Sequence, residues 1–266
     1  MDQTTQKLIP VRNGHLAVDI YGEPDGPAVV VIPGVMADAA AWAPVATALS
    51  AWPTVAVVNR RGRQASAPLT AEYSVDLEVE DAVTVLGRFS NVRTLFGWSF
   101  GALIALHAAD DVSVPHLIGY EPIMAPFGSS ALPGLRQADA AGDQDASVEV
   151  ALRDVTGMPL EVIEGLRAQA PVWDELRRLS TPIYAETQAI NDNPRPAARA
   201  SRAARVDLIV GARNQGQAPY GTTFADVART IPEAAIHLLP GQGHLAHLEA
   251  PTQLAALVDA IGHDQP

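Results

Sequence analysis

The sequence predicts an α/β protein: a mostly parallel, doubly wound sheet with an inserted helical cap. Short, largely apolar runs alternate with helical patterns through the first half of the chain, as in a sheet covered by helices on both faces. The alternation stops over residues 125–204 and resumes after them. The strand candidates are apolar at consecutive positions, which is typical of strands buried on both faces.

The sheet core is expected to contain seven strands and five helices. The helix candidates carry alanine or apolar residues at a spacing of three to four. Ser74, followed by acidic residues, is expected to cap one of them, and Pro251 suits a first helical turn. Strands are expected at residues 16–21, 28–34, 54–62 (with its turn), 92–98, 115–122, 206–212 and 235–241. Helices are expected at residues 39–51, 74–88, 99–109, 224–230 and 251–261.

Residues 125–204 contain helical segments joined by loops rich in glycine, proline and aspartate. A helical stretch of this length between two strands is best placed as a cap at the carboxyl edge of the sheet, where caps commonly form the walls of a substrate pocket. The expected organisation is therefore a core of residues 1–124 and 205–266 and a cap of residues 125–204. Helices are expected within the cap at residues 147–155, 159–169 and 172–190.

The composition excludes several classes of protein. A net charge of −12 argues against nucleic acid or an anionic membrane as partner and favours a neutral or hydrophobic small molecule. No run of 18 apolar residues and no apolar leader segment occurs, so we expect a cytoplasmic protein without a membrane span. The absence of cysteine excludes disulfides, a thiolate nucleophile and cysteine-ligated zinc. The oligomeric state stays open, a homodimer included.

The segment LFGWSFGAL places Ser99 between two glycines, after a strand candidate and before a helical pattern. In that context G-x-S-x-G indicates a nucleophile on a strained turn, because Gly97 and Gly101 let strand and helix approach closely. The hydroxyl of Ser99 would then stand above the sheet, with the backbone N–H of Phe100 beside it. The alternative is a serine that only caps the helix.

With this motif in place, the chain resembles the α/β-hydrolase fold over nearly its whole length, with the cap after the sixth core strand. The resemblance implies a serine hydrolase with Ser99 as nucleophile. The family's oxyanion loop, usually His-Gly after the third strand, looks like Pro33, Gly34 and Val35 here. The histidine is missing, but the loop has to supply only a backbone N–H, which Val35 or Gly34 can still provide.

The resemblance also implies a histidine base after the last strand, and GQGHLAHLEAP supplies His244 in that position. His247 competes with it and is interpreted as structural or pocket-lining. Gly241, Gly243 and Ala246 match a dinucleotide fingerprint, but too little chain follows for a βαβ unit, so no cofactor is expected. The two histidines are too few ligands for a metal site, and no metal is expected.

The acid is where the sequence departs from the common family pattern. The usual Gly-x-x-Asp reads Gly-Ala-Arg-Asn at residues 211–214. We expect Glu121 instead, because Pro122 ends its strand and leaves Glu121 at the same sheet edge as Ser99. A carboxylate in an apolar strand is costly to bury unless it is paired, and His244 would be its partner. The alternatives that stay open are Asn214, Asp192 and Asp226.

This acid placement is known in haloalkane dehalogenases and in zearalenone-degrading lactone hydrolases, and the chain resembles the second group in two more places. Residues 171–173, Pro-Val-Trp, look like a cap segment of that group whose tryptophan reaches the substrate. Trp173 is thus expected either at the substrate or in the cap core. Residues 210–229 likewise lack the usual aspartate. Trp98 and Met36 are the other expected substrate contacts.

Three arginines follow the strand that ends at Asn59, where the family often has Asp-x-Arg-Gly. Such residues can attract an anionic substrate. On a strongly acidic chain, ordinary ion pairs are the favoured interpretation. The residues concerned are Arg60, Arg61 and Arg63.

These inferences predict a serine hydrolase that cleaves a carboxylic ester or lactone of a small hydrophobic substrate through an acyl-enzyme. Serine rather than aspartate at position 99 argues against dehalogenase and epoxide-hydrolase chemistry, which need an alkylatable carboxylate. Two alternatives stay open. One is a non-hydrolytic cyclase, isomerase or ligand-binding protein on the same fold, and the other is a carbon–carbon bond hydrolase.

Overall fold

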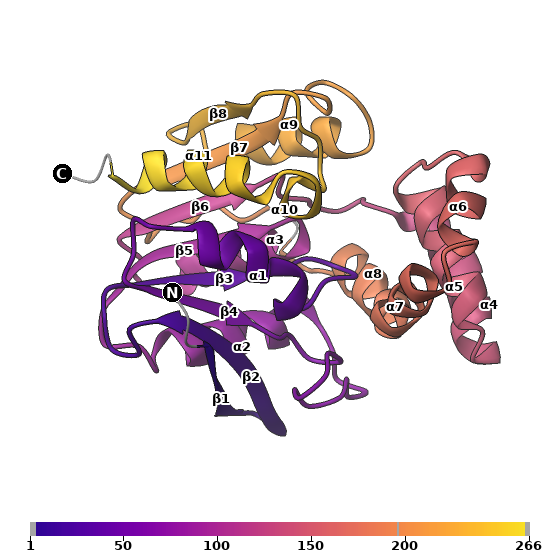
Figure 1. Ribbon diagram of the computed structural model, residues 1–266, viewed down its shortest axis with the longest axis horizontal. Coiled ribbons are helices and arrows are strands. Elements are labelled where there is room, and N and C mark those ends of the chain that lie inside the picture. The colour runs from indigo at the N-terminus through magenta and orange to yellow at the C-terminus, as the bar shows by residue number, and fades with distance from the viewer. Residues whose placement is uncertain (1–3, 196, 264–266) are drawn as a thin grey trace.

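One eight-stranded sheet forms the centre of the computed structural model, which describes residues 4–195 and 197–263 (Figure 1). Its strands are β1 (Thr4–Val11), β2 (Gly14–Gly22), β3 (Ala28–Ile32), β4 (Thr54–Val58), β5 (Val92–Trp98), β6 (His116–Tyr120), β7 (Val206–Gly211) and β8 (Ala235–Leu239). They lie in the order β1-β2-β4-β3-β5-β6-β7-β8. β2 pairs antiparallel with β1 and β4, and every later pair is parallel.

Helices cover both faces of the sheet. One face carries α1 (Ala39–Ala48), α10 (Ala246–Glu249) and α11 (Pro251–His263), and the other carries α2 (Val75–Leu86), α3 (Phe100–Asp111) and α9 (Tyr220–Thr230). Successive side chains of a strand point to opposite faces. In β3, Val29 and Val31 pack with α1 and α11, whereas Val30 and Ile32 pack with α2 and α3. This two-sided burial explains why the strand is apolar at every position.

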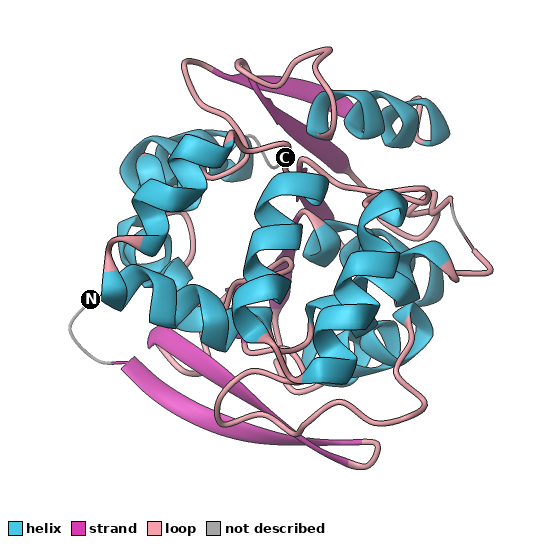
Figure 2. Ribbon diagram, turned by 90° about the vertical axis from the view of Figure 1, so that its right-hand side faces the viewer, coloured by secondary structure: helices cyan, strands magenta, loops and turns pink. Residues whose placement is uncertain are grey.

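The cap leaves the sheet after β6 and returns at β7. It contains η1 (Ser129–Ala131), α4 (Leu132–Ala141), α5 (Gln144–Val150), η2 (Ala151–Val155), α6 (Leu160–Arg167), α7 (Ala170–Ser180) and α8 (Ile183–Asn191). Figure 1 shows these helices set off to one side of the sheet, and Figure 2 looks at the molecule from that side. Val35 and Met36, just after β3, pack against the apolar clusters of the cap. The cap therefore lies over the carboxyl edge of the parallel strands.

The predicted fold class is confirmed, and the differences are local. The sequence interpretation missed β1, an edge strand whose side chains are mostly exposed and polar, and it missed α4 in the cap. The single helix expected over 172–190 is wrong, because the chain breaks into α7 and α8 at Pro182, which has no N–H to continue the helix. Residues 1–3 and 264–266 of the expected core and residue 196 of the expected cap lie outside the described residues. Among the described helices, none is long and apolar enough to cross a membrane.

Candidate active site

Ser99 lies on the turn between β5 and α3. Its backbone angles, φ 56° and ψ −120°, fall in a region that residues with a side chain rarely adopt. Close packing imposes this turn: a Cβ on Gly101 would overlap the carbonyl oxygen of Ile32, and one on Gly97 would lie 2.5 Å from Cα of Ala102. Ser99 makes no side-chain capping bond to α3, which lies wholly within the described chain. The capping interpretation therefore fails.

His244 and Glu121 meet at the carboxyl edge of the sheet. Nδ1 of His244 lies 2.6 Å from Oε2 of Glu121, and the two residues are 8% and 0% exposed. Glu121 follows β6 directly and has a φ of 42°, while its N–H donates to the carbonyl of Ile209 at 2.9 Å. The backbone is thus strained where the carboxylate leaves the strand. This contact pairs the buried carboxylate with the imidazole.

Asn214 holds the carboxylate instead of replacing it. Its Nδ2 lies 3.0 and 2.9 Å from the two oxygens of Glu121, and the N–H of Gly211 donates to Oε1 at 2.8 Å. Together with His244, these donors satisfy both carboxylate oxygens. Asn214 therefore occupies the family's usual acid position but contacts Glu121, which in turn contacts His244. The other two acid candidates lie elsewhere: Asp226 pairs with Arg229 on α9, and Asp192 ends α8.

Three aromatic side chains hold the loop that carries His244. The ring of Tyr220 stacks on the imidazole at 3.6 Å between centroids and 12° between planes. Trp98 donates from its indole N–H to the carbonyl of His244 at 2.9 Å, and the hydroxyl of Tyr120 donates to the carbonyl of Gly243. The sequence interpretation missed Tyr120 and Tyr220. A tyrosine at the strand end before the acid was the available signal for the first, and nothing in the sequence singles out the second.

Burial disfavours the protonated form of the His244 imidazole. Burial lowers the pKa of His244 more than the hydrogen bond and charge of Glu121 raise it, so the pKa lies below its ordinary value of 6.5. With Nδ1–H donated to Glu121, Nε2 is left as a proton acceptor. His247 lies between Trp42 and Trp98, with centroids 4.9 and 4.2 Å away, and burial together with His244 lowers its pKa to about 3. His247 is thus a structural residue in this core.

Backbone N–H groups approach Ser99 from two sides. Phe100 begins α3, so its N–H is one of those that lack a partner within the helix. On the other side, Gly34 passes so close that an added Cβ would lie 2.9 Å from Cβ of Ser99. Val35 and Met36 follow, half-buried beneath the cap, with Met36 at a φ of 53°. A tetrahedral oxyanion needs donors in this arrangement.

Two of the expected substrate contacts lie in packed cores. Trp173 is 5% exposed, donates to Asp145 at 2.5 Å and has the guanidinium of Arg167 4.7 Å from its ring. It packs with cap residues, which favours the cap-core interpretation. Trp98 is 3% exposed between Trp42 and the histidines, where it positions the loop of His244 and does not line an open surface. Met36 is half-buried and packs against the cap clusters, and its contact with a substrate stays a prediction.

The three arginines after β4 make ion pairs, as expected, but these pairs are buried and do not lie on the surface. Arg60, Arg61 and Arg63 are 2%, 0% and 3% exposed, and each guanidinium is paired with a buried carboxylate. Burial and pairing leave them no route to an anionic substrate. The physical reason is that all three point inward from the turn, where each donates to a backbone carbonyl as well as to its carboxylate.

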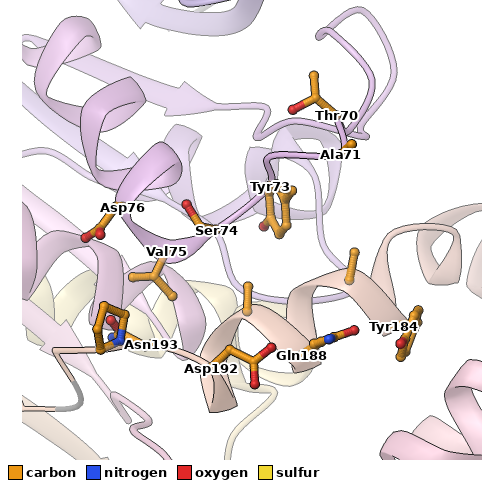
Figure 3. Close-up of a pocket in the computed structure, with 13 residues that line it drawn as sticks. Thr70, Ala71, Tyr73, Ser74, Val75, Asp76, Tyr184, Gln188, Asp192 and Asn193 are labelled. Carbon is orange, nitrogen blue, oxygen red and sulfur yellow. The ribbon is translucent and has the colours of Figure 1, made fainter.

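A cavity of about 260 Å³ lies away from Ser99, between the start of α2 and helix α8 of the cap (Figure 3). Its walls include Tyr73, Asp76, Gln188 and Asp192. Ser99, Glu121 and His244 do not line this cavity, so it is a separate feature of the boundary between cap and core. Figure 3 shows the ring of Tyr73 in this wall.

The described residues also contain no group of three or more His, Cys, Asp or Glu side chains placed to hold a metal ion. The dinucleotide-like match at residues 241–246 leads from β8 into α10, which has four residues, and then into α11. A helix of one turn offers little of the dipole on which a pyrophosphate rests.

The chain belongs to the alpha/beta hydrolase family, whose model matches residues 29–257. It is similar to an alpha/beta hydrolase from Sphaerobacter thermophilus DSM 20745, with 24% identity over 96% of this chain and 99% of that one and a TM-score of 0.73. It is also similar to an enol-lactonase from Burkholderia xenovorans LB400, with 18% identity over 97% of this chain and 100% of that one and a TM-score of 0.76. An esterase from Rhodococcus sp. ECU1013 has 18% identity over 99% of each chain and a TM-score of 0.70. Among curated proteins, no sequence matches the chain.

Proposed function

We propose that this chain is a serine hydrolase that cleaves a carboxylic ester or lactone of a small hydrophobic molecule through an acyl-enzyme. The observation that carries the proposal is the buried hydrogen bond of 2.6 Å between Glu121 and His244, at the sheet edge where the strained turn presents Ser99. Ser99, Glu121 and His244 follow one another along the chain as serine, carboxylate and imidazole, which matches the nucleophile, acid and base order of the fold.

In the proposed reaction, Oγ of Ser99 attacks the substrate carbonyl and its proton passes to Nε2 of His244. The N–H groups of Phe100 and of Val35 or Gly34 stabilise the oxyanion. When the intermediate collapses, the carbon–oxygen bond breaks and His244 returns the proton to the leaving alcohol. Water then adds to the acyl-enzyme by the same route, which releases the carboxylic acid and restores Ser99. Glu121 stabilises the imidazolium in both halves of the reaction.

The surroundings of the site favour a substrate with an apolar acyl or ring part. Val35 and Met36 lie where core and cap meet and pack against apolar cap clusters. The arginines nearby are already paired, so they give no attraction to an anionic substrate. The similar proteins include one called an esterase and one called an enol-lactonase, which supports this class of bond. Macrocyclic lactones of the zearalenone type are the finer substrate hypothesis.

The test is covalent labelling of Ser99 with a fluorophosphonate, followed by turnover of a panel of aryl esters and macrocyclic lactones. We expect wild type to be labelled and Ser99→Ala not, with kcat of the variant lower by roughly 10⁶. Mass spectrometry during turnover should find the acyl group on Ser99. Equal labelling of wild type and Ser99→Ala would overturn the proposal, and turnover without a Ser99 adduct would favour the non-hydrolytic alternative.

A further inference from the structure

The oxyanion loop is held from behind by two buried arginines. Nε and Nη2 of Arg60 donate to the carbonyls of Pro33 and Gly34, each at 2.8 Å. Arg63 donates to the carbonyl of Ala37 at 3.1 Å and to that of Gly34 at 3.3 Å. Both arginines come from the turn after β4, the strand next to β3. The planar, forked guanidinium can hold two neighbouring carbonyls at once, which an ammonium group cannot do in the same geometry.

These bonds fix the direction of the amide groups in the loop. In a trans peptide, C=O and the following N–H point in opposite directions. Because the carbonyls of Pro33 and Gly34 face Arg60, the N–H groups of Gly34 and Val35 face away from it. They are the donors that the oxyanion requires. A positive charge on the carbonyl also polarises the peptide and makes its N–H a stronger donor.

Arg60 also touches the other side of the oxyanion hole. Its guanidinium carbon lies 4.8 Å from the centroid of the Phe100 ring, a cation–π contact made by the residue that supplies the second N–H. One buried side chain therefore contacts both segments that face Ser99.

The cap anchors these arginines. Glu186 of α8, which is fully buried, lies 2.7 Å from Nη2 of Arg60 and also pairs with Arg63. On the core side, Glu78 of α2 lies 2.8 Å from Nη1 of Arg60 and accepts from the hydroxyl of Tyr73 at 2.7 Å. The charge on Arg60 is thus balanced by one carboxylate from the core and one from the cap.

We propose that Arg60 is a positioning residue for the oxyanion hole and that Glu186 of the cap holds it there, so that the seated cap and the formed oxyanion hole depend on each other. This inference rests on the proposed serine hydrolase function. The competing explanation is that Arg60 only stabilises the core, as any buried ion pair would.

The adjacent Arg61 provides a matched control. It is buried too, but it is bound to Asp81 and to the carbonyl of Arg12 instead of the oxyanion loop. Arg60→Lys keeps the positive charge but loses the planar guanidinium that donates to two neighbouring carbonyls at once. We expect kcat to fall roughly 100-fold with KM little changed, and inhibition by a trifluoromethyl ketone, whose adduct carries an oxyanion, to weaken by a similar factor. Arg61→Lys should lower the melting temperature comparably while kcat stays within threefold. Equal losses of kcat in the two variants would overturn the inference.

A readout that does not need turnover separates this inference from the proposed function. The amide resonance of Val35 in a ¹H–¹⁵N spectrum should move in Arg60→Lys and stay in place in Arg61→Lys. An unmoved resonance rejects the positioning role even in an inactive protein, whereas a moved resonance in a protein whose Ser99 is not labelled supports positioning and rejects the hydrolase.

If Arg60→Lys does not fold, a cap variant gives the same test. Glu186→Gln removes the cap's charge from Arg60, and we expect kcat to fall about tenfold with the Val35 resonance shifted. Its control is Arg178→Gln, which breaks another contact between cap and core, the 2.5 Å pair with Asp38, and should leave both readouts unchanged. Identical behaviour of the two cap variants would contradict the coupling.

Discussion

Among the described residues, two clusters pair a buried carboxylate with histidine, and they lie at opposite ends of the same sheet. At the carboxyl edge, Glu121 accepts from His244, Asn214 and the N–H of Gly211. At the amino edge, Asp207 of β7 accepts from His116 at 2.7 Å and His237 at 2.6 Å, and pairs with Arg205 at 2.6 Å. Both carboxylates are 0% exposed. A buried histidine–carboxylate pair is therefore no mark of an active site by itself.

What separates the clusters is backbone strain and the charge of the partners. Asp207 sits in regular parallel pairing, in register with Ile118, and its partners are two imidazoles and a guanidinium. Burial would raise its pKa, but the hydrogen bonds from those partners outweigh burial and hold the pKa below its ordinary value. Glu121 instead has a positive φ, its donors besides His244 are the uncharged amides of Gly211 and Asn214, and it lies beside a serine that is strained as well. Strain that the surroundings maintain is typical of functional sites.

The sharpest way to separate the two clusters is to neutralise Glu121. Glu121→Gln should lower kcat by roughly 10⁴, because the amide cannot stabilise the imidazolium or keep Nδ1 of His244 protonated. The melting temperature should change less than kcat does, and fluorophosphonate labelling of Ser99 should slow in parallel. A variant that retains kcat within tenfold would remove Glu121 from the proposed triad.

Neutralising Asp207 should have the reverse effect. Asp207→Asn removes the buried carboxylate that pairs with Arg205 and accepts from His116 and His237, so we expect a loss of about 3–5 kcal/mol in the free energy of unfolding, with kcat per folded molecule unchanged. Because the folded-state pKa is lowered, the carboxylate stabilises the fold above its ordinary pKa of 3.8, and this contribution is lost as the pH falls below that value. Urea unfolding at several pH values measures both effects. A fall in kcat without a fall in stability would mean that Asp207 takes part in catalysis, which contradicts its structural role.

The elements that could be predicted from the sequence are those whose structure is determined by neighbouring residues. Ser99 could be placed because the flanking glycines are required wherever a helix leaves a strand so tightly, and Gly101 indeed packs on Ile32. Glu121 could be chosen over Asn214 because Pro122 has to end the strand and because a buried carboxylate needs a partner. The continuous apolar runs predicted β3 and β4 as strands buried on both faces.

The rest depends on contacts between distant segments, which no local pattern records. Nothing near Arg60 in the sequence shows that Glu186, more than a hundred residues later, will neutralise it. The same holds for Tyr220 on His244 and for the donors of Asn214 to Glu121. β1 was missed because an exposed edge strand need not be apolar. The resemblance leaves Trp173 open between a substrate contact and a cap-core residue, because its packing is set by the cap helices around it.

The pH dependence of activity also distinguishes the Glu121 cluster from the Asp207 cluster. His244 must be neutral to accept the proton of Ser99, so kcat/KM should rise with pH through its pKa and stay level above it. Since burial lowers this pKa, the midpoint should lie below 6.5. The charge of Glu121 raises the pKa, so Glu121→Gln should shift the midpoint to lower pH still, and Asp207→Asn should leave it where it is. A midpoint above 6.5 in wild type would contradict the burial that the structure gives His244.

The smallest effect is expected for Asn214, which touches the base only through the acid. Asn214→Ala removes two donors from Glu121 but leaves the bonds from Gly211 and His244. We expect kcat/KM to fall about tenfold, which corresponds to about 1.4 kcal/mol. Asn214→Asp is the informative companion, because a second carboxylate beside Glu121 repels it, and its activity should fall further as the pH rises. If Asn214→Ala instead lowered kcat/KM as much as Glu121→Gln, the asparagine after β7, and not the glutamate after β6, would orient His244.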